Sequence, residues 1–353
     1  MEQLHGGDWA GYLSEYGALP LDFSVNVSPL GLPEGVRRAA EAALREAERY
    51  PDPLCRALRR GLSAQHGVPE EQIVCGAGAA ELIFRLPTAL RPKKALLPTP
   101  CFSEYEHALK NADCAAEHFP LREDRGFALT EEILERIDGE TDLLFLCEPN
   151  NPTGRTTDRA LLLKILRRCA QTGTLPVVDE CFNELLDDPR AHTLEGELSA
   201  FPDLIMLRAF TKSHAMAGLR LGYALCGRAE TAARLRDCAQ PWAVSAPAQA
   251  AGLAALEEHE YLERLHALLR EQRPFLAAGL ARLGCRVVPG EANFLLFHCE
   301  DDALCEKLRP KGVLLRDCRS FPGLGPGWYR AAVRTQEENE TFLNTLGEVL
   351  SGG

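Results

Sequence analysis

Residues 208–223 read Arg-Ala-Phe-Thr-Lys-Ser-His-Ala-Met-Ala-Gly-Leu-Arg-Leu-Gly-Tyr, and the rest of the chain is organised around them. The apolar run at 203–207 predicts a buried strand directly before this stretch. Lys212 therefore falls just past a strand end, next to Thr211 and before the Gly-Leu-Arg-Leu-Gly run at 218–222. A lysine flanked by a hydroxyl and an arginine suits an amine that forms a Schiff base beside a bound phosphate. Most lysines near strand ends are merely solvated, so the neighbouring strands must decide between the two interpretations.

Length and composition are those of an ordinary globular protein. The chain has 353 residues, enough for two domains, with 46% apolar and 25% charged residues. Its net charge of −12 argues against a nucleic acid or a membrane surface as partner. No apolar run approaches the about 20 residues of a bilayer span. The N-terminus lacks the basic and apolar regions of a signal peptide, and we expect a cytoplasmic protein.

The thirteen cysteines are scattered along the chain, and none of them forms a C-x-x-C pair. Most stand in apolar or helical surroundings, where a thiol behaves as a small hydrophobic group. We therefore expect reduced cysteines and no metal site.

Apolar runs alternate with helix-length amphipathic stretches from residue 72 onward. These runs lie at 72–75, 94–98, 114–119, 143–147, 175–179, 204–208 and 221–226. The alternation predicts an α/β fold whose central sheet is mostly parallel, with helices on both faces. In such sheets ligands bind outside the carboxyl ends of the strands.

The two ends of the chain show a different pattern. Two helices are expected near 34–49 and 53–66, and a long helical region near 245–272, with Pro274 marking a boundary. Beyond it, short strands mix with helices in an α+β pattern; the strands lie at 285–289, 293–298, 313–316 and 328–333, and the helices at 302–309 and 336–350. We expect a large domain over 32–272 and a smaller domain built from 1–31 and 273–353, which closes over the large one.

Two candidate ligand contacts follow the first strands of the series. The turn Cys75-Gly-Ala-Gly-Ala-Ala-Glu81 comes after a strand and opens a helix, a place where backbone N–H groups can converge on an anion. Phe102 follows the next strand, where an aromatic ring can stack on a planar cofactor. Taken singly, a tight turn and core packing are the ordinary explanations of these residues.

Two further candidates follow later strands. Asn151, in the turn Glu148-Pro-Asn-Asn-Pro-Thr-Gly154, can donate its amide to a phenolate oxygen. Asp179 ends the strand before Lys212, and burial of its carboxylate costs several kcal/mol unless it is paired. A protonated ring nitrogen would pair it and keep the ring an electron sink. At the ends of successive strands, these residues together meet the demands of pyridoxal phosphate.

The sequence resembles the fold-type I pyridoxal-phosphate enzymes of the aminotransferase class that includes histidinol-phosphate aminotransferase, over essentially its whole length. Within that class it particularly resembles the threonine-phosphate decarboxylases of cobalamin biosynthesis. The marks are His5-Gly-Gly, Asp22-Phe-Ser-Val-Asn-Val-Ser-Pro-Leu-Gly31, Arg49-Tyr-Pro-Asp52, the turn 148–154 and Trp328-Tyr-Arg-Ala-Ala-Val-Arg334.

The resemblance implies a role for each cofactor contact. Lys212 would bind pyridoxal 5'-phosphate covalently, Asp179 would pair the ring nitrogen, Asn151 would bind the phenolate oxygen, and Phe102 would stack on the ring. The phosphate contacts would be Gly76, Ala77, Gly78, Thr211 and Arg220. Tyr50 resembles the tyrosine that reaches the phosphate from a neighbouring subunit, which implies a symmetric homodimer.

The substrate contacts implied by the resemblance are two arginines and two residues near the N-terminus. Arg330 would bind the substrate carboxylate and Arg316 its phosphate, in a bidentate geometry that lysine cannot reproduce. His5 and Asn26 resemble residues that close over the substrate. A solvated arginine and a free N-terminal tail are the ordinary alternatives.

Several positions depart from the family pattern. Phe182 replaces the tyrosine common in the aminotransferases and favours a decarboxylase, because one hydrogen bond to the phenolate is lost. Ala209 replaces a phosphate-binding hydroxyl and implies weaker cofactor binding. Ala77 and Ser28 each stand where relatives often have asparagine.

The implied reaction is decarboxylation of L-threonine O-3-phosphate to (R)-1-aminopropan-2-ol O-2-phosphate. Transamination, as in histidinol-phosphate aminotransferase, is the first alternative, because the bond that breaks depends on geometry that the sequence does not show. Serine phosphate is an alternative substrate, since it lacks one methyl group worth about 1–3 kcal/mol of discrimination. A non-catalytic sensor module is a further alternative, against which Lys212, Asp179, Arg316 and Arg330 count.

Overall fold

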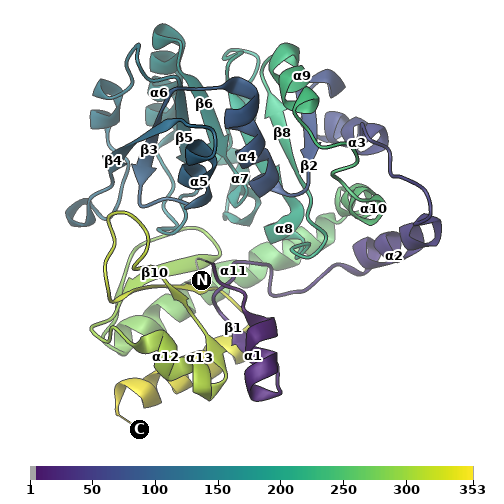
Figure 1. Ribbon diagram of the computed structural model, residues 1–353. Coiled ribbons are helices and arrows are strands. Elements are labelled where there is room, and N and C mark those ends of the chain that lie inside the picture. Colours follow the sequence, from purple (N-terminus) through teal and green to yellow (C-terminus); the bar gives the residue numbers. More distant parts are fainter. Residues whose placement is uncertain (1–4, 353) are drawn as a thin grey trace.

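The computed structural model describes residues 5–352 and is built around a seven-stranded sheet (Figure 1). The strand order is β2-β8-β7-β6-β5-β3-β4. The bounds are β2 Ile73–Gly76, β3 Lys94–Thr99, β4 Ala115–Pro120, β5 Leu143–Cys147, β6 Leu175–Asp179, β7 Ile205–Ala209 and β8 Gly222–Cys226. Every neighbouring pair is parallel except those of β8, which runs antiparallel to both β2 and β7. The predicted α/β fold with a mostly parallel sheet is confirmed.

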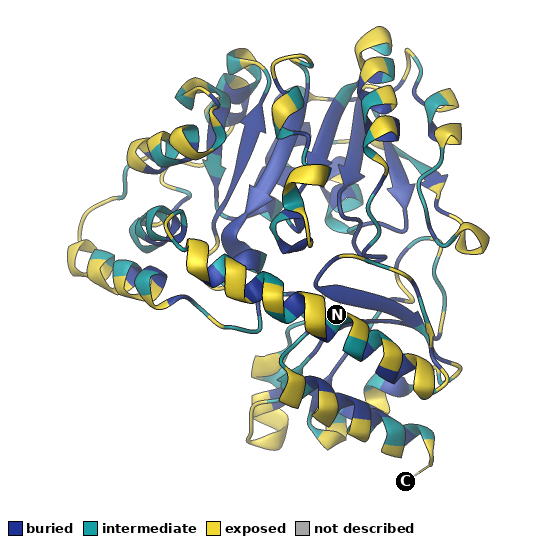
Figure 2. Cartoon of the chain, turned by 180° about the vertical axis from the view of Figure 1, so that it is seen from behind, coloured by how far each residue is buried: buried dark blue, intermediate teal, exposed yellow. Residues whose placement is uncertain are grey.

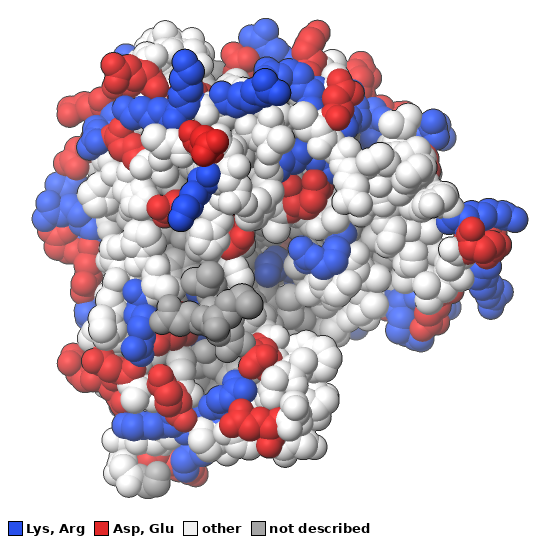
Figure 3. All heavy atoms as spheres, viewed as in Figure 1, with Lys and Arg blue, Asp and Glu red and all other residues white. Residues whose placement is uncertain are grey.

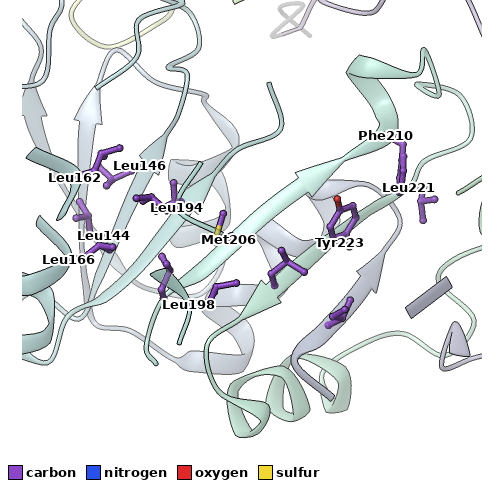
Figure 4. Close-up of a cluster of buried hydrophobic side chains, with 14 of the residues drawn as sticks. Leu144, Leu146, Leu162, Leu166, Leu194, Leu198, Met206, Phe210, Leu221 and Tyr223 are labelled. Atoms are coloured by element: carbon purple, nitrogen blue, oxygen red, sulfur yellow. The ribbon is translucent and has the colours of Figure 1, made fainter. Parts of the chain in front are cut away.

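The sheet is covered on both faces, which is why its inner strands consist mostly of buried apolar residues rather than alternating; the edge strand β4 is only partly buried and contains Glu117 and His118. Side chains of successive residues in β5 enter opposite cores: Leu143 and Phe145 pack with α4, α5 and α9, while Leu144 and Leu146 pack with α3, α6 and α10. Figure 4 shows part of the second core, and Figure 2 shows the strands buried behind helices that are exposed only on their outer sides.

The helices of this part of the chain come before, between and after the strands. Their bounds are α2 Glu34–Ala43, α3 Arg56–His66, α4 Ala79–Leu90, α5 Glu104–Lys110, α6 Arg159–Thr172, α7 Pro189–His192, α8 Phe210–Ser213, α9 Ala229–Asp237 and α10 Ala246–Ala255. The expected helix over 34–49 is shorter, because after Ala43 the chain passes into a 3-10 turn at Leu44–Glu46.

The C-terminal part forms a second sheet, in the order β12-β13-β10-β9, with its own apolar core. Its strands are β9 Arg286–Val287, β10 Phe294–His298, β12 Arg316–Asp317 and β13 Trp328–Ala332, packed with α11 His259–Arg282, α12 Leu304–Leu308 and α13 Gln336–Leu350. The start of the chain joins this part, because β1 Leu21–Asp22, which follows α1 Trp9–Tyr16, pairs in parallel with β11 Val313–Leu314.

Two expectations for the C-terminal half are wrong in detail. Pro274 lies inside α11, which continues to Arg282, and the helical region 245–272 is interrupted between Ala255 and His259. The single strand expected at 313–316 is two strands in two different sheets. This split gives Arg316 a place on β12, directly beside β13.

Over residues 5–352, no helix is long and apolar enough to cross a membrane. The same residues contain no group of three or more His, Cys, Asp or Glu side chains that could hold a metal ion. All thirteen cysteines are free thiols. On the face seen in Figure 3, acidic and basic side chains are interspersed rather than gathered into a basic stripe.

Candidate active site

A cavity of about 260 Å³ opens at the carboxyl ends of the central strands, against the C-terminal sheet. Its volume is near the lower end of small-molecule sites. Ten of the residues predicted from the sequence line it: His5, Asn26, Phe102, Asn151, Asp179, Thr211, Lys212, Arg220, Arg316 and Arg330. Residues from both ends of the chain and from four central strand ends thus meet in one place.

Lys212 lies in α8, the single helical turn that follows β7. Its ammonium forms no hydrogen bond or ion pair with any residue in 5–352, and it lies 5.6 Å from the centroid of the Phe182 ring. Burial, and then the positive charge of Arg330, lowers the pKa of Lys212 from 10.5 to about 8. A neutral amine is therefore accessible near physiological pH, as a nucleophilic lysine requires.

Asp179 ends β6, and its buried carboxylate accepts two hydrogen bonds from the protein, which leaves acceptor capacity for a ligand. One oxygen accepts the phenol O–H of Tyr105 at 2.7 Å, and the other accepts the backbone N–H of Cys181 at 3.0 Å. Burial raises the pKa of Tyr105 well above 10.0, so the phenol stays protonated and remains a donor. Tyr105 also stacks on Phe145 at 4.8 Å between centroids. Tyr105 lies in α5, and no local sequence pattern indicates its contact with Asp179.

Arg330, on β13, joins three segments that are far apart in the sequence. Its guanidinium donates to Oδ1 of Asn151 and, at 3.0 Å, to the backbone carbonyl of Ser24. With its amide oxygen turned toward the arginine, Asn26 accepts from Nη1 and Nε at 3.2 Å each. Burial lowers the pKa of Arg330 from 12.5 to about 10. Because Asn151 uses its oxygen for Arg330, its amide N–H groups stay available to a ligand.

Arg316 stands directly opposite Arg330 in the register of β12 and β13. It is buried, yet its guanidinium makes no hydrogen bond or ion pair within the described residues 5–352; it stacks on Phe321, 5.3 Å from the ring centroid. Burial lowers the pKa of Arg316 below its usual value. A buried cation without a partner is costly, so this arrangement suits an anionic ligand.

The predicted phosphate turn lies beside the cavity, but two of its N–H groups are already used. Gly78 donates to the carbonyl of Gly76 at 2.8 Å, and Ala77 donates to the Glu81 carboxylate at 3.2 Å. The cavity is lined instead by the next residues, Ala79 and Ala80, whose N–H groups open α4 and have no partner within 5–352. The free donors at this turn are therefore one step further along the chain than the sequence suggests.

Arg220 packs against this turn, and its side chain leaves no room for a Cβ at Gly78. A Cβ added at Gly78, where φ is +90°, would stand 2.6 Å from Nη2 of Arg220. Arg220 itself adopts a left-handed φ of 59° and donates to the carbonyl of Ala217 at 3.1 Å. The guanidinium is thus held at the N-terminus of α4, where both it and the helix favour a negatively charged group.

Tyr50 does not line the cavity. Its side chain is 78% exposed and stacks on Trp242 at 4.4 Å between ring centroids; Trp242 is also exposed. A contact between Tyr50 and a neighbouring subunit stays a prediction.

These residues fit pyridoxal phosphate. One cavity is faced by a lysine with a lowered pKa, a buried carboxylate oriented by two donors, and an amide; the lysine ammonium and the amide N–H groups have no partner in the described part of the chain. An arginine lies at a helix N-terminus beside the cavity. Phe102 lies on the wall and meets Tyr105 edge to face at 5.7 Å.

The fold and these side chains define the class of fold-type I pyridoxal-phosphate enzymes. The chain belongs to the aminotransferase class I and II family, whose model matches residues 20–346. Enzymes of this family depend on pyridoxal phosphate, act on small molecules and are generally homodimers.

The similar proteins include both a decarboxylase and aminotransferases. The chain is 38% identical to the threonine-phosphate decarboxylase of Salmonella typhimurium, over 99% of this chain and 97% of the relative. It is 36% identical to the histidinol-phosphate aminotransferase of Symbiobacterium thermophilum, over 93% and 90% of the two chains. Among solved structures, the histidinol-phosphate aminotransferase of Clostridium acetobutylicum superposes with a TM-score of 0.88 at 26% identity, covering 94% of this chain and 99% of that one.

Proposed function

We propose that the protein decarboxylates L-threonine O-3-phosphate, giving (R)-1-aminopropan-2-ol O-2-phosphate and CO2. The observation that carries the proposal is the guanidinium of Arg316, which is buried beside Arg330 in the same cavity as Lys212 and has no hydrogen-bond partner among residues 5–352. Two neighbouring arginines suit a substrate with two anionic groups, and a phosphorylated amino acid has both. The decarboxylase relative, which matches nearly the whole chain, supports the same choice.

In this proposal Lys212 would hold the cofactor covalently, and Asp179 would pair its ring nitrogen. Asn151 would donate its amide N–H groups to the phenolate oxygen, and Phe102 would contact the ring. Thr211, Arg220 and the turn at 76–80 would hold the phosphate. When bound, pyridoxal phosphate takes up the electron pair left at the substrate α-carbon when CO2 departs.

The arginines position the substrate. Arg330 binds the carboxylate and Arg316 the phosphate, while His5 and Asn26 cover the substrate from the N-terminal segment. Lys212 would also move a proton at Nζ, and a pKa of about 8 makes both of its protonation states accessible near neutral pH. The apolar ring of Phe182 beside Lys212 offers no hydroxyl to the phenolate.

Histidinol-phosphate aminotransferase is the second candidate, favoured by the relative that is 36% identical over 93% of the chain. Its substrate also has a phosphate and an amine, so Arg316 would serve it as well. The two functions differ in whether Cα–CO2 or Cα–H breaks.

The deciding assay supplies the purified protein with pyridoxal phosphate and threonine phosphate, but no keto acid. Release of CO2 that is lost in Lys212→Ala supports the proposal. Activity that appears only with 2-oxoglutarate and histidinol phosphate contradicts it and identifies an aminotransferase. Serine phosphate in a parallel reaction measures how much the extra methyl group contributes, with a preference of about 10–100-fold expected for threonine phosphate.

We also propose that Tyr50 completes the phosphate site of a neighbouring subunit. Its exposed ring, held by Trp242, is free to contact a second copy of the chain. Dimers mixed from Tyr50→Phe and Lys212→Ala chains test this, because one of the two sites then carries both changes and the other carries none. The mixed dimer should recover about half of the activity of a wild-type dimer, which has two intact sites. Absence of any recovery would contradict the shared site.

A further inference from the structure

His5 connects the N-terminal segment to the large domain at the edge of the cavity. Its Nε2 lies 2.8 Å from Oε1 of Glu104, near the start of α5, and its ring lies 6.2 Å from that of Phe102. His5 is half exposed, whereas the Glu104 side chain is only 14% exposed. The imidazole is therefore held by a carboxylate that is itself well ordered by its surroundings.

Two other donors fix the same carboxylate. Oε1 of Glu104 also lies 3.2 Å from Nδ1 of His107, on the next turn of α5, and 3.4 Å from the hydroxyl of Ser103. Such a network holds a side chain in one geometry far better than an isolated surface pair does. Glu104 consequently presents a fixed acceptor to whatever approaches from the N-terminal segment.

The opposite side of this segment is tied to the substrate arginines. Gly7 donates its N–H to the hydroxyl of Ser24 at 2.8 Å, and a Cβ at Gly6 would stand 2.4 Å from the carbonyl of Ser24, so the two backbones are in close contact. That carbonyl accepts from Arg330 at 3.0 Å. The segment thus spans the cavity edge between Arg330 on one side and Glu104 on the other.

We infer that Glu104 is a positioning residue for the substrate: it holds the His5 imidazole at the cavity so that His5 can contact the bound phosphorylated substrate. The inference rests on the proposed function for the identity of that substrate. Glu104 touches neither substrate nor cofactor, and no bond forms or breaks at it. Its effect should appear in substrate affinity rather than in the chemical step.

The test uses the holoenzyme with a matched control on the same helix. Glu104→Gln keeps the shape and removes the charge, while Glu106→Gln makes the same change two residues on, where the carboxylate faces His118 at 3.5 Å and does not line the cavity. Glu104→Gln should raise KM for threonine phosphate about tenfold, or about 1.4 kcal/mol, with kcat unchanged. Glu106→Gln should leave both constants within about twofold of wild type.

A double-mutant cycle shows whether Glu104 acts through His5. If it does, His5→Ala combined with Glu104→Gln should be no worse than His5→Ala alone, because the partner that Glu104 positions is already gone. Additive losses overturn the inference, and so does a fall in kcat with unchanged KM. Melting temperatures of all variants are compared with wild type, so that a folding defect is recognised.

A second readout needs no turnover. Hydrogen exchange of the peptide covering residues 5–9 should be faster in Glu104→Gln than in wild type or in Glu106→Gln, in protein without substrate. Equal exchange in the two variants overturns the inference. If the wild-type protein releases no CO2 from threonine phosphate, the proposed function fails, whereas the exchange experiment and calorimetric binding of threonine phosphate still decide the role of Glu104.

Discussion

Arg316 and Arg330 lie on neighbouring strands of the C-terminal sheet, but their guanidinium groups differ in the contacts that they make with the protein. They face each other across β12 and β13, and both are buried. Arg330 donates to Asn26, Asn151 and Ser24. The guanidinium of Arg316 makes no hydrogen bond within residues 5–352 and rests on the ring of Phe321.

The difference separates a guanidinium that mainly holds the site together and keeps one N–H for the substrate carboxylate from a guanidinium that the described residues leave entirely to a ligand. A guanidinium has five N–H donors; with the amide of Asn26 turned toward it, Arg330 commits four of them to the protein, and Arg316 commits none. Both bear the desolvation cost of burial, which lowers their pKa values. For Arg330 the protein itself offsets that cost, whereas for Arg316 an anion must do so.

Loss of Arg330 should produce the largest effect. Arg330→Gln leaves the Asn151 and Ser24 acceptors without a cationic donor and removes the proposed carboxylate contact, so kcat/KM should fall about 1,000-fold, or about 4 kcal/mol. The melting temperature should fall as well, because the N-terminal segment at 24–26 and the turn at 148–154 lose their common partner. Steady-state kinetics and thermal unfolding measure the two effects. An unchanged melting temperature would contradict the connecting role given to Arg330.

Arg316→Gln should have a smaller and different effect. KM for threonine phosphate should rise about 10- to 100-fold, because a charge-assisted contact of about 1.5–3 kcal/mol is lost. The melting temperature should not fall, since no protein hydrogen bond is removed and an unpaired buried charge disappears. Arg316→Lys should restore little of the affinity, because an ammonium cannot make a bidentate contact. A drop in melting temperature like that of Arg330→Gln would erase the contrast between the two arginines.

The pH dependence of cofactor attachment should also distinguish them. Because the pKa of Lys212 is lowered to about 8, attachment of pyridoxal phosphate to the apoprotein should speed up with rising pH and level off above about 8, where the amine is neutral. Arg330 is the strongest charge that lowers this pKa. Its replacement by Gln should move the plateau to higher pH, toward 10.5, and Arg316→Gln should move it less. The growth of the visible absorption band measures the rate; identical profiles in all three proteins would contradict the assignment.

Tyr105→Phe should give the smallest effect and tests the cofactor side of the cavity. The change removes one donor to Asp179 and leaves the stacking on Phe145, so cofactor affinity should weaken about threefold to tenfold. Equilibrium dialysis of the apoprotein measures it. Phe145→Leu, which alters the stack and keeps the phenol, is the matched control, and a larger loss there would assign the role of Tyr105 to packing instead.

Strands and turns could be predicted from the sequence where a local pattern of residues indicates them. Apolar runs placed every strand of the central sheet to within about one or two residues, because strands covered on both faces must be apolar throughout. The turn at 76–78 was recognised as a strand-to-helix turn, yet its free N–H groups belong to Ala79 and Ala80. Which N–H groups are used up depends on the Glu81 side chain and on the course of the turn, and glycine spacing does not record either.

Contacts between segments far apart in the chain could not be predicted from local sequence patterns. Tyr105 on Asp179 and Glu104 on His5 join residues 74 and 99 positions apart, and neither residue stands in a pattern that names its partner. The strand expected at 313–316 split in two because Val313 pairs with the start of the chain, whereas Arg316 pairs with β13.

The sequence alone determined that a lysine, an aspartate, an asparagine and an aromatic ring follow successive buried strands, since apolar runs and the polar residues after them are local properties of a parallel sheet. Only the tertiary structure decided which of two buried arginines is satisfied by the protein and which is left to a ligand. That outcome depends on carbonyl and amide groups from residues 24, 26 and 151, which the fold alone brings to one guanidinium.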